Sequence, residues 1–87
     1  TFGPAVCANG KPNEAVRSEY REAAPAIMAL KEKSTRKQIL AAMCSDRTAN
    51  ATSVQIFDAL QYQEARHGWP PRKIRRAERD IVAERYC

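Results

Sequence analysis

The stretch Thr52–Gly68, TSVQIFDALQYQEARHG, has the features of a complete α-helix. Thr52 and Gln55 have the spacing of a capping box, in which each side chain accepts a hydrogen bond from the backbone N–H of the other residue. The apolar residues that follow recur at helical spacing and form one face of the helix; they are Ile56, Phe57 and Leu60. Gly68 is expected to end the helix, because glycine readily takes the left-handed conformation beyond the last turn.

A second helix precedes this one and begins with the same signal. Thr35 and Gln38 form another capping-box pattern, and the apolar face that follows contains Ile39, Leu40 and Met43. We expect this helix to end near residues 44–46, because residues 47–52 are polar and typical of a loop. A helix-turn-helix would pair residues 35–44 with 53–66. The expected connection, residues 45–52, is longer than the usual three or four residues.

The amino-terminal part of the chain combines an irregular arm with a broken helix. Residues 1–12 contain two glycines and two prolines, which favour turns. Asn13 is a typical helix cap. A stripe of apolar residues at helical spacing follows it: Val16, Tyr20, Ala23, Ile27 and Leu30. Pro25 interrupts this stripe, so we expect a kink or break at Ala24.

The carboxy-terminal part predicts one more helix. Trp69 should pack at the corner after Gly68, and Pro71 suits the first position of a new helix. The buried stripe of that helix would contain Ile74, Ala77, Ile81 and Val82. No segment shows the alternation typical of a strand. The sequence therefore predicts an all-α fold: an arm over residues 1–12 and a single domain over residues 13–87, a small bundle of four to five helices with short loops.

Composition restricts the class of protein. The chain has 87 residues, of which 44% are hydrophobic and 29% charged, as in ordinary globular domains. The longest uncharged apolar stretch, residues 23–30, is far shorter than the ~20 residues of a membrane span, so we expect no membrane partner. The sequence starts at Thr1 rather than Met, which is consistent with a mature secreted protein after cleavage and also with an excised domain.

Three cysteines, Cys7, Cys44 and Cys87, are too widely spaced for a typical zinc or thioredoxin-like motif. We favour a disulfide between Cys7 and Cys87, because it would staple the two ends of a small domain, where chains fray. Cys44 would then be a buried thiol. Pairings that use Cys44, three reduced thiols, and a dimer linked through the odd cysteine remain open. A disulfide implies a secreted or periplasmic protein.

Basic residues crowd the expected last helix. They are Arg72, Lys73, Arg75, Arg76 and Arg79. Cations in the first turns of a helix are unfavourable by roughly 0.3–1 kcal/mol each when exposed, so an anionic partner would relieve them. The anions could be carboxylates on another protein, phosphates of nucleic acid, or the glutamates of this chain's first helix. Trp69 and Tyr62 are further candidate contact residues, with packing at the helix corner as the alternative interpretation.

One segment is similar to a family of DNA-binding proteins. Residues 57–81, with a helix, a Gly-Trp-Pro-Pro turn and a second helix, resemble the start of the winged-helix domain of LexA-type repressors. The resemblance covers under a third of the chain, and the DNA-reading helix of that family follows the two that match. We therefore do not assign this chain to the family.

These observations favour a binding protein over an enzyme. No paired carboxylates, phosphate-binding glycine loop or metal-ligand cluster stands out, and we expect neither a cofactor nor catalysis. The one histidine, His67, lies at a helix end where a cation suits the helix dipole. We predict a basic, extracytoplasmic helical protein that binds another protein with an acidic surface, as inhibitor, immunity or effector proteins do. The alternative is a nucleic-acid-binding domain that uses the arginines of the last helix.

Overall fold

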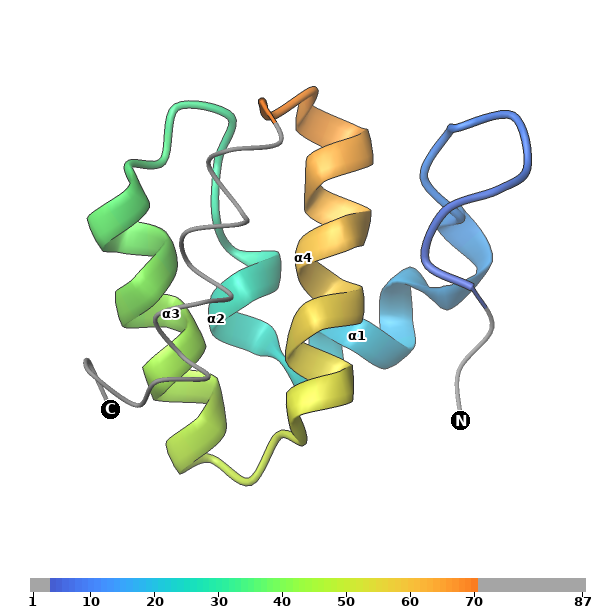
Figure 1. Ribbon diagram of the computed structural model, residues 1–87. Helices are drawn as coiled ribbons and strands as arrows, with labels where there is room; N and C mark the ends of the chain where they lie inside the picture. Colours follow the sequence, from blue (N-terminus) through green and yellow to red (C-terminus); the bar gives the residue numbers. More distant parts are fainter. Residues whose placement is uncertain (1–3, 71–87) are drawn as a thin grey trace.

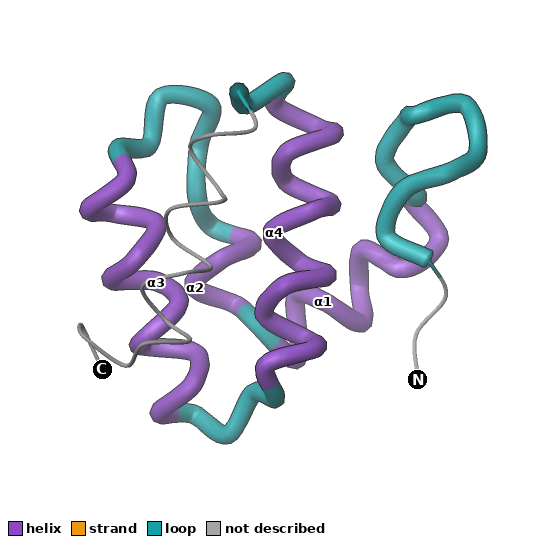
Figure 2. Tube along the Cα trace, in the orientation of Figure 1, coloured by secondary structure: helices purple, strands orange, loops and turns teal. Residues whose placement is uncertain are grey.

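The computed structural model describes residues 4–70, which form helices joined by short connections (Figures 1 and 2). The elements in chain order are the 3₁₀ turn η1 (Glu14–Val16), α1 (Arg17–Ala23), α2 (Pro25–Met28), α3 (Arg36–Thr48) and α4 (Ser53–His67). Within this part of the chain the only β-type pairing is one isolated bridge between Val6 and Pro12 in the arm. The predicted all-α class is confirmed for the described residues.

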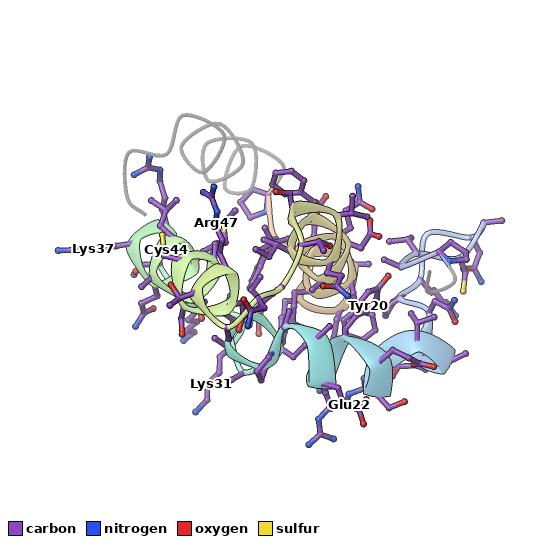
Figure 3. The ribbon with its side chains drawn as sticks, turned by 90° about the horizontal axis from the view of Figure 1, so that it is seen from below. Tyr20, Glu22, Lys31, Lys37, Cys44 and Arg47 are labelled. Atoms are coloured by element: carbon purple, nitrogen blue, oxygen red, sulfur yellow. The ribbon has the colours of Figure 1, made fainter. Side chains whose placement is uncertain are left out.

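The helices form two layers. α3 and α4 are consecutive and run in opposite directions side by side, and both are seen nearly end-on in Figure 3. α1 and α2 form the second layer, in which the short α2 contacts α1, α3 and α4. The arm lies on the side of α4 opposite to α3 (Figure 1). α2 is therefore the element that joins the layers.

The first helical segment begins and breaks where the sequence indicates. Asn13 caps η1 by accepting a hydrogen bond from the N–H of Ala15 (3.1 Å), and its amide donates to the carbonyl of Pro4 (2.8 Å). Ala24 leaves the helical conformation (φ −136°, ψ 64°) and separates α1 from α2, which starts at Pro25. The predicted break is confirmed, because proline has no N–H to continue the hydrogen bonding of α1.

The two longer helices also begin as predicted. Thr35 and Gln38 make both hydrogen bonds of a capping box on α3, and Thr52 and Gln55 do the same on α4. Gly68 adopts the left-handed conformation (φ 67°, ψ 35°), and its N–H donates to the carbonyl of Glu64 (2.8 Å). Local hydrogen-bonding chemistry, readable from the sequence, therefore fixes three of the four ends of the α3–α4 pair.

The fourth end was predicted wrongly. α3 continues past Cys44 and Asp46 to Thr48, and the chain turns only at Asn50, which takes a positive φ of 80°. The hydroxyl of Thr48 donates to the carbonyl of Cys44 (2.9 Å), which satisfies an acceptor in the last turn. The last turn is polar for a structural reason: Asp46 is only 1% exposed and bonds to α2 rather than to water.

Two buried polar side chains hold α2 at its two ends. The carboxylate of Asp46 accepts hydrogen bonds from the N–H groups of Ala26 (3.0 Å) and Ile27 (2.9 Å). The side-chain amide of Gln63, on α4, donates to the carbonyls of Ile27 (2.9 Å) and Leu30 (3.2 Å). A four-residue helix leaves most of its backbone groups without internal partners, so these bonds replace the ones that further turns would make.

The core lies between the two layers and is mostly aliphatic, with two tyrosines and a tryptophan. Its largest apolar side chains with no more than 6% exposure are Val16, Tyr20, Ile27, Ile39, Leu40, Met43, Ile56, Leu60, Tyr62 and Trp69. The rings of Tyr20 and Tyr62 are 6.3 Å apart and tilted by 53°. Burial raises the pKa of both phenols above the ordinary value of 10.0; Asp58 adds to the effect at Tyr20 and Glu14 at Tyr62.

The cysteines depart from the favoured pairing. Cys7 is an exposed free thiol on the arm, so the structure does not contain the Cys7–Cys87 disulfide. Cys44 is half-buried on α3 rather than fully buried. Cys87 and the predicted last helix lie outside the described residues. A dimer through the odd cysteine stays a prediction.

Candidate functional site

The two aromatic residues proposed as contacts are core residues. Tyr62 is fully buried, and its hydroxyl donates to a carboxylate oxygen of Glu14 (3.0 Å). Trp69 is 4% exposed, and its Nε1–H donates to the carbonyl of Glu32 (3.0 Å). Neither ring is presented to a partner, because each is enclosed by the fold. The interpretation as a surface contact is therefore corrected: both residues pack, as the alternative interpretation had it.

The basic residues proposed as contacts cannot be placed. Arg72, Lys73, Arg75, Arg76 and Arg79 lie outside the described residues.

The outer side of α2 carries two adjoining hollows that meet at Ala29. One, of about 520 Å³, lies between α2 and the start of α3, where Lys31 and Lys33 line it together with Ala26 and Leu30. The other, of about 350 Å³, lies between α1 and α2 and is lined by Arg17 and Arg21 beside Pro25 and Met28. We call this surface the α2 face; its residues are Arg17, Arg21, Pro25, Ala26, Met28, Ala29, Leu30, Lys31 and Lys33.

The α2 face combines an apolar floor with a basic rim. Ala29 and Pro25 are exposed, and Met28 and Leu30 are partly exposed. Between Arg17 and Gln38 the chain has six basic and three acidic residues, a net charge of +3. Figure 3 shows Lys31 and Glu22 projecting away from α3 and α4 on this side.

The rim cations have few internal partners. Arg17 makes an ion pair with Glu14 at 3.9 Å, at the outer limit for such a contact. Arg21, Lys31 and Lys33 make no ion pair within residues 4–70. Their charges are therefore available to a partner that brings carboxylates or other anions.

The structure also shows whether α3 and α4 form a helix-turn-helix. Because α3 extends to Thr48, its connection to α4 consists of four residues, Ala49–Thr52. The prediction that this connection is too long for a helix-turn-helix was therefore wrong. The two helices nonetheless run antiparallel instead of crossing at the ~90–120° of that motif (Figure 1). The pair is therefore an αα-hairpin, in which α4 contacts α1, α2 and α3.

His67, at the end of α4, lies against an aromatic ring. The ring of His67 stacks on Trp69, with centroids 5.5 Å apart and planes 25° apart. No group of three or more His, Cys, Asp and Glu side chains is placed to hold a metal ion in residues 4–70. In the same range, none of the helices has the length and apolar character needed to traverse a bilayer.

Sequence reasoning missed the α2 face. Its residues come from two helices and a connection that the broken stripe of residues 16–30 suggested only as core. A signal was present: Arg21, Lys31 and Lys33 fall off the apolar stripe on both sides of Pro25. Whether they gather around an apolar floor depends on the bend at Ala24, which periodicity alone does not specify.

Comparison with known proteins adds no assignment, since no protein-family model, curated protein or solved structure matches the chain.

Proposed function

We propose that this chain is an extracytoplasmic helical protein that binds another protein through the α2 face. The observation that carries the proposal is the pairing of an exposed apolar floor, around Ala29, with rim cations that lack internal ion pairs. The partner surface that fits is apolar at its centre and acidic at its edge. Its carboxylates would meet Arg21, Lys31 and Lys33, and its apolar centre would cover Ala29.

The apolar floor favours a protein over nucleic acid. Interfaces between proteins place apolar groups at the centre and polar groups at the rim. A nucleic-acid site is instead dominated by cations and donors directed at phosphates and base edges. The rim charges would mainly steer the encounter and exclude basic surfaces, while covering Met28, Ala29 and Leu30 would supply affinity.

The compartment is part of the proposal. A secreted or periplasmic location rests on a disulfide, which persists in an oxidising environment. Because Cys7 is free, the pairing that remains open within the chain is Cys44 with Cys87. Such a bond would also suit a chain of this size, whose small core gains from a covalent staple.

The test compares two charge-matched double variants of the full chain. Lys31→Glu with Lys33→Glu reverses two charges of the α2 face. Lys11→Glu with Arg66→Glu reverses two exposed charges on the arm and on α4. Each immobilised protein is incubated with the secreted or periplasmic fraction of its source, and retained proteins are quantified by mass spectrometry.

We expect at least one acidic protein to be retained by the wild type and the control variant and to fall at least tenfold with the α2-face variant. Equal retention by both variants contradicts the assignment to α2. A separate column of double-stranded DNA at low salt tests the alternative. Retention of the wild type there, lost as salt rises, would favour nucleic-acid binding.

A further inference from the structure

A third hollow lies between the arm and the second half of α4, which are neighbours in Figure 1. Its volume of about 460 Å³ falls within the roughly 300–1,000 Å³ that is usual for ligand pockets. It shares no residue with the α2 face. We call this hollow the arm groove; its lining residues are Val6, Gly10, Gln61, Glu64, Ala65, Gly68 and Trp69.

Hydrogen bonds fix both walls of the arm groove. In the arm, the N–H of Gly10 donates to the carbonyl of Cys7 (2.9 Å), which closes the turn. At the end of α4, the N–H groups of Gly68 and Trp69 both donate to the carbonyl of Glu64 (2.8 and 3.2 Å). The groove is therefore preformed, as ligand sites usually are.

Two glycines leave space beside the walls. Gly10 and Gly68 have positive φ values of 83° and 67°, which favour glycine, and a Cβ at either position would meet no atom within 4 Å. A ligand can therefore approach both backbones closely. Val6 and Ala65, both partly buried, add apolar surface to the same groove.

Glu64 is the one charged residue among the described residues that line the arm groove. Its side chain is partly buried and makes no hydrogen bond or ion pair within residues 4–70. No lysine or arginine lies three or four residues away along α4, where helical neighbours meet. The residue also belongs to the last turn of α4, where the helix dipole disfavours a negative charge. A cation in the groove would compensate this carboxylate.

The other lining residues favour arginine among the cations. Its guanidinium is planar, stacks on aromatic rings and forms paired hydrogen bonds with a carboxylate, and the groove offers the indole of Trp69 and the carboxylate of Glu64. The exposed side-chain amide of Gln61 supplies a further acceptor oxygen. A lysine ammonium, which is a strongly hydrated point charge, would use less of this set.

We propose that the arm groove binds an arginine side chain presented by a segment of another protein. The guanidinium pairs with Glu64 beside Trp69, and the methylene stem lies on Val6 and Ala65. The open space at the two glycines accommodates the backbone that carries the side chain.

This site goes beyond the proposed function and is separate from it, because it takes the opposite charge and uses other residues. The Lys31→Glu, Lys33→Glu double variant, which should lose binding at the α2 face, should bind arginine in the arm groove as the wild type does. Failure of either proposal is therefore seen without the other.

Titration of the full chain with blocked tripeptides tests the site. One peptide has arginine between two alanines, and the other has citrulline in its place, which is similar in shape but uncharged. Trp69 is the only tryptophan of the chain, so its fluorescence reports on the groove. In nuclear magnetic resonance spectra, the backbone amides of Gly10 and Gly68 locate the ligand. We expect saturable changes in both signals with the arginine peptide, and binding of the citrulline peptide that is weaker by at least about tenfold.

A matched pair of variants assigns the charge. Glu64→Gln should weaken binding of the arginine peptide by at least about tenfold, whereas Glu22→Gln, which neutralises an exposed carboxylate on α1, should bind as the wild type does. The comparison of the two peptides uses the wild-type protein and so does not depend on the stability of a variant.

Three results would overturn the proposal. They are equal binding of the two peptides, equal binding by the two variants, and unchanged Gly10 and Gly68 amides at about 10 mM arginine peptide, which would fill even a site with a Kd of about 1 mM.

Discussion

Replacing Asp46 is the most direct test of how α2 is held. Its two carboxylate oxygens accept the N–H groups of Ala26 and Ile27 at 3.0 and 2.9 Å, and the side chain is 1% exposed. Pro25 has no N–H, and the N–H of Met28 bonds to the carbonyl of Ala24 (3.0 Å). Asp46→Ala would thus leave both remaining donors at the start of α2 without acceptors.

The expected loss can be worked from these contacts. Each donor left unsatisfied in a buried site costs roughly 1–3 kcal/mol, and the small cavity adds to the loss. Removing the carboxylate returns part of the cost of burying it. We expect Asp46→Ala to lower the free energy of unfolding by about 3 kcal/mol. A protein of this length has roughly 4–13 kcal/mol in all. Asp46→Asn keeps one acceptor but directs an N–H₂ group at the other donor, so we expect a loss of about 2 kcal/mol.

Urea unfolding followed by circular dichroism at 222 nm measures these losses. With a slope of roughly 1–1.5 kcal/mol per molar urea for a small protein, 3 kcal/mol shifts the midpoint by about 2–3 M. Glu22→Ala, which removes an exposed carboxylate from α1, is the control and should change stability by less than about 0.5 kcal/mol. If Asp46→Ala behaves like this control, the hydrogen bonds to α2 do not stabilise the fold and the reasoning is refuted.

Two further predictions concern single residues. Because burial raises the pKa of Tyr20 and Tyr62 above 10.0, their contribution to stability is complete below pH 10 and is lost as the pH rises through the higher folded-state values. Thermal unfolding between pH 8 and 11.5 should therefore show a smaller decline for Tyr62→Phe than for the wild type, and equal declines would contradict this. Gly68→Ala should cost about 1–2 kcal/mol and Gly68→Asn less, because φ is 67° while a Cβ would meet no atom within 4 Å. Chemical denaturation measures the free energy of unfolding of both variants, and values equal to that of the wild type would contradict this prediction.

The parts of the fold that the sequence predicted depend on neighbours in the chain. The capping boxes at Thr35 and Thr52, the break before Pro25 and the stop at Gly68 each involve residues within four positions. The end of α3 was predicted wrongly because it depends on a partner 20 residues away: a polar stretch containing Asp46 is typical of a loop unless α2 supplies donors for its carboxylate.

The candidate site depended on long-range packing even more strongly. The α2 face exists because the chain bends at Ala24 and because Gln63, more than 30 residues away, bonds to the end of α2. Neither effect leaves a pattern in the local sequence. Tyr62 was misjudged for the same reason. Its aromatic side chain suggested an interface, but in the folded chain it is buried and its hydroxyl donates to Glu14.

The bonds that hold α2 also have a direction. Asp46 offers only acceptors and thus fits the end of a helix that presents N–H groups, while the amide of Gln63 donates to the end that presents carbonyls. A reversed α2 would set a carboxylate against carbonyl oxygens, and a shift by one residue would bring Pro25, which has no N–H, into the place of a donor. Apolar contacts alone have no direction, so they would allow so short a helix to shift along its axis or to pack in the reverse orientation. The outward surface around Ala29 is consequently set before any partner arrives, so docking there would spend little entropy on ordering it.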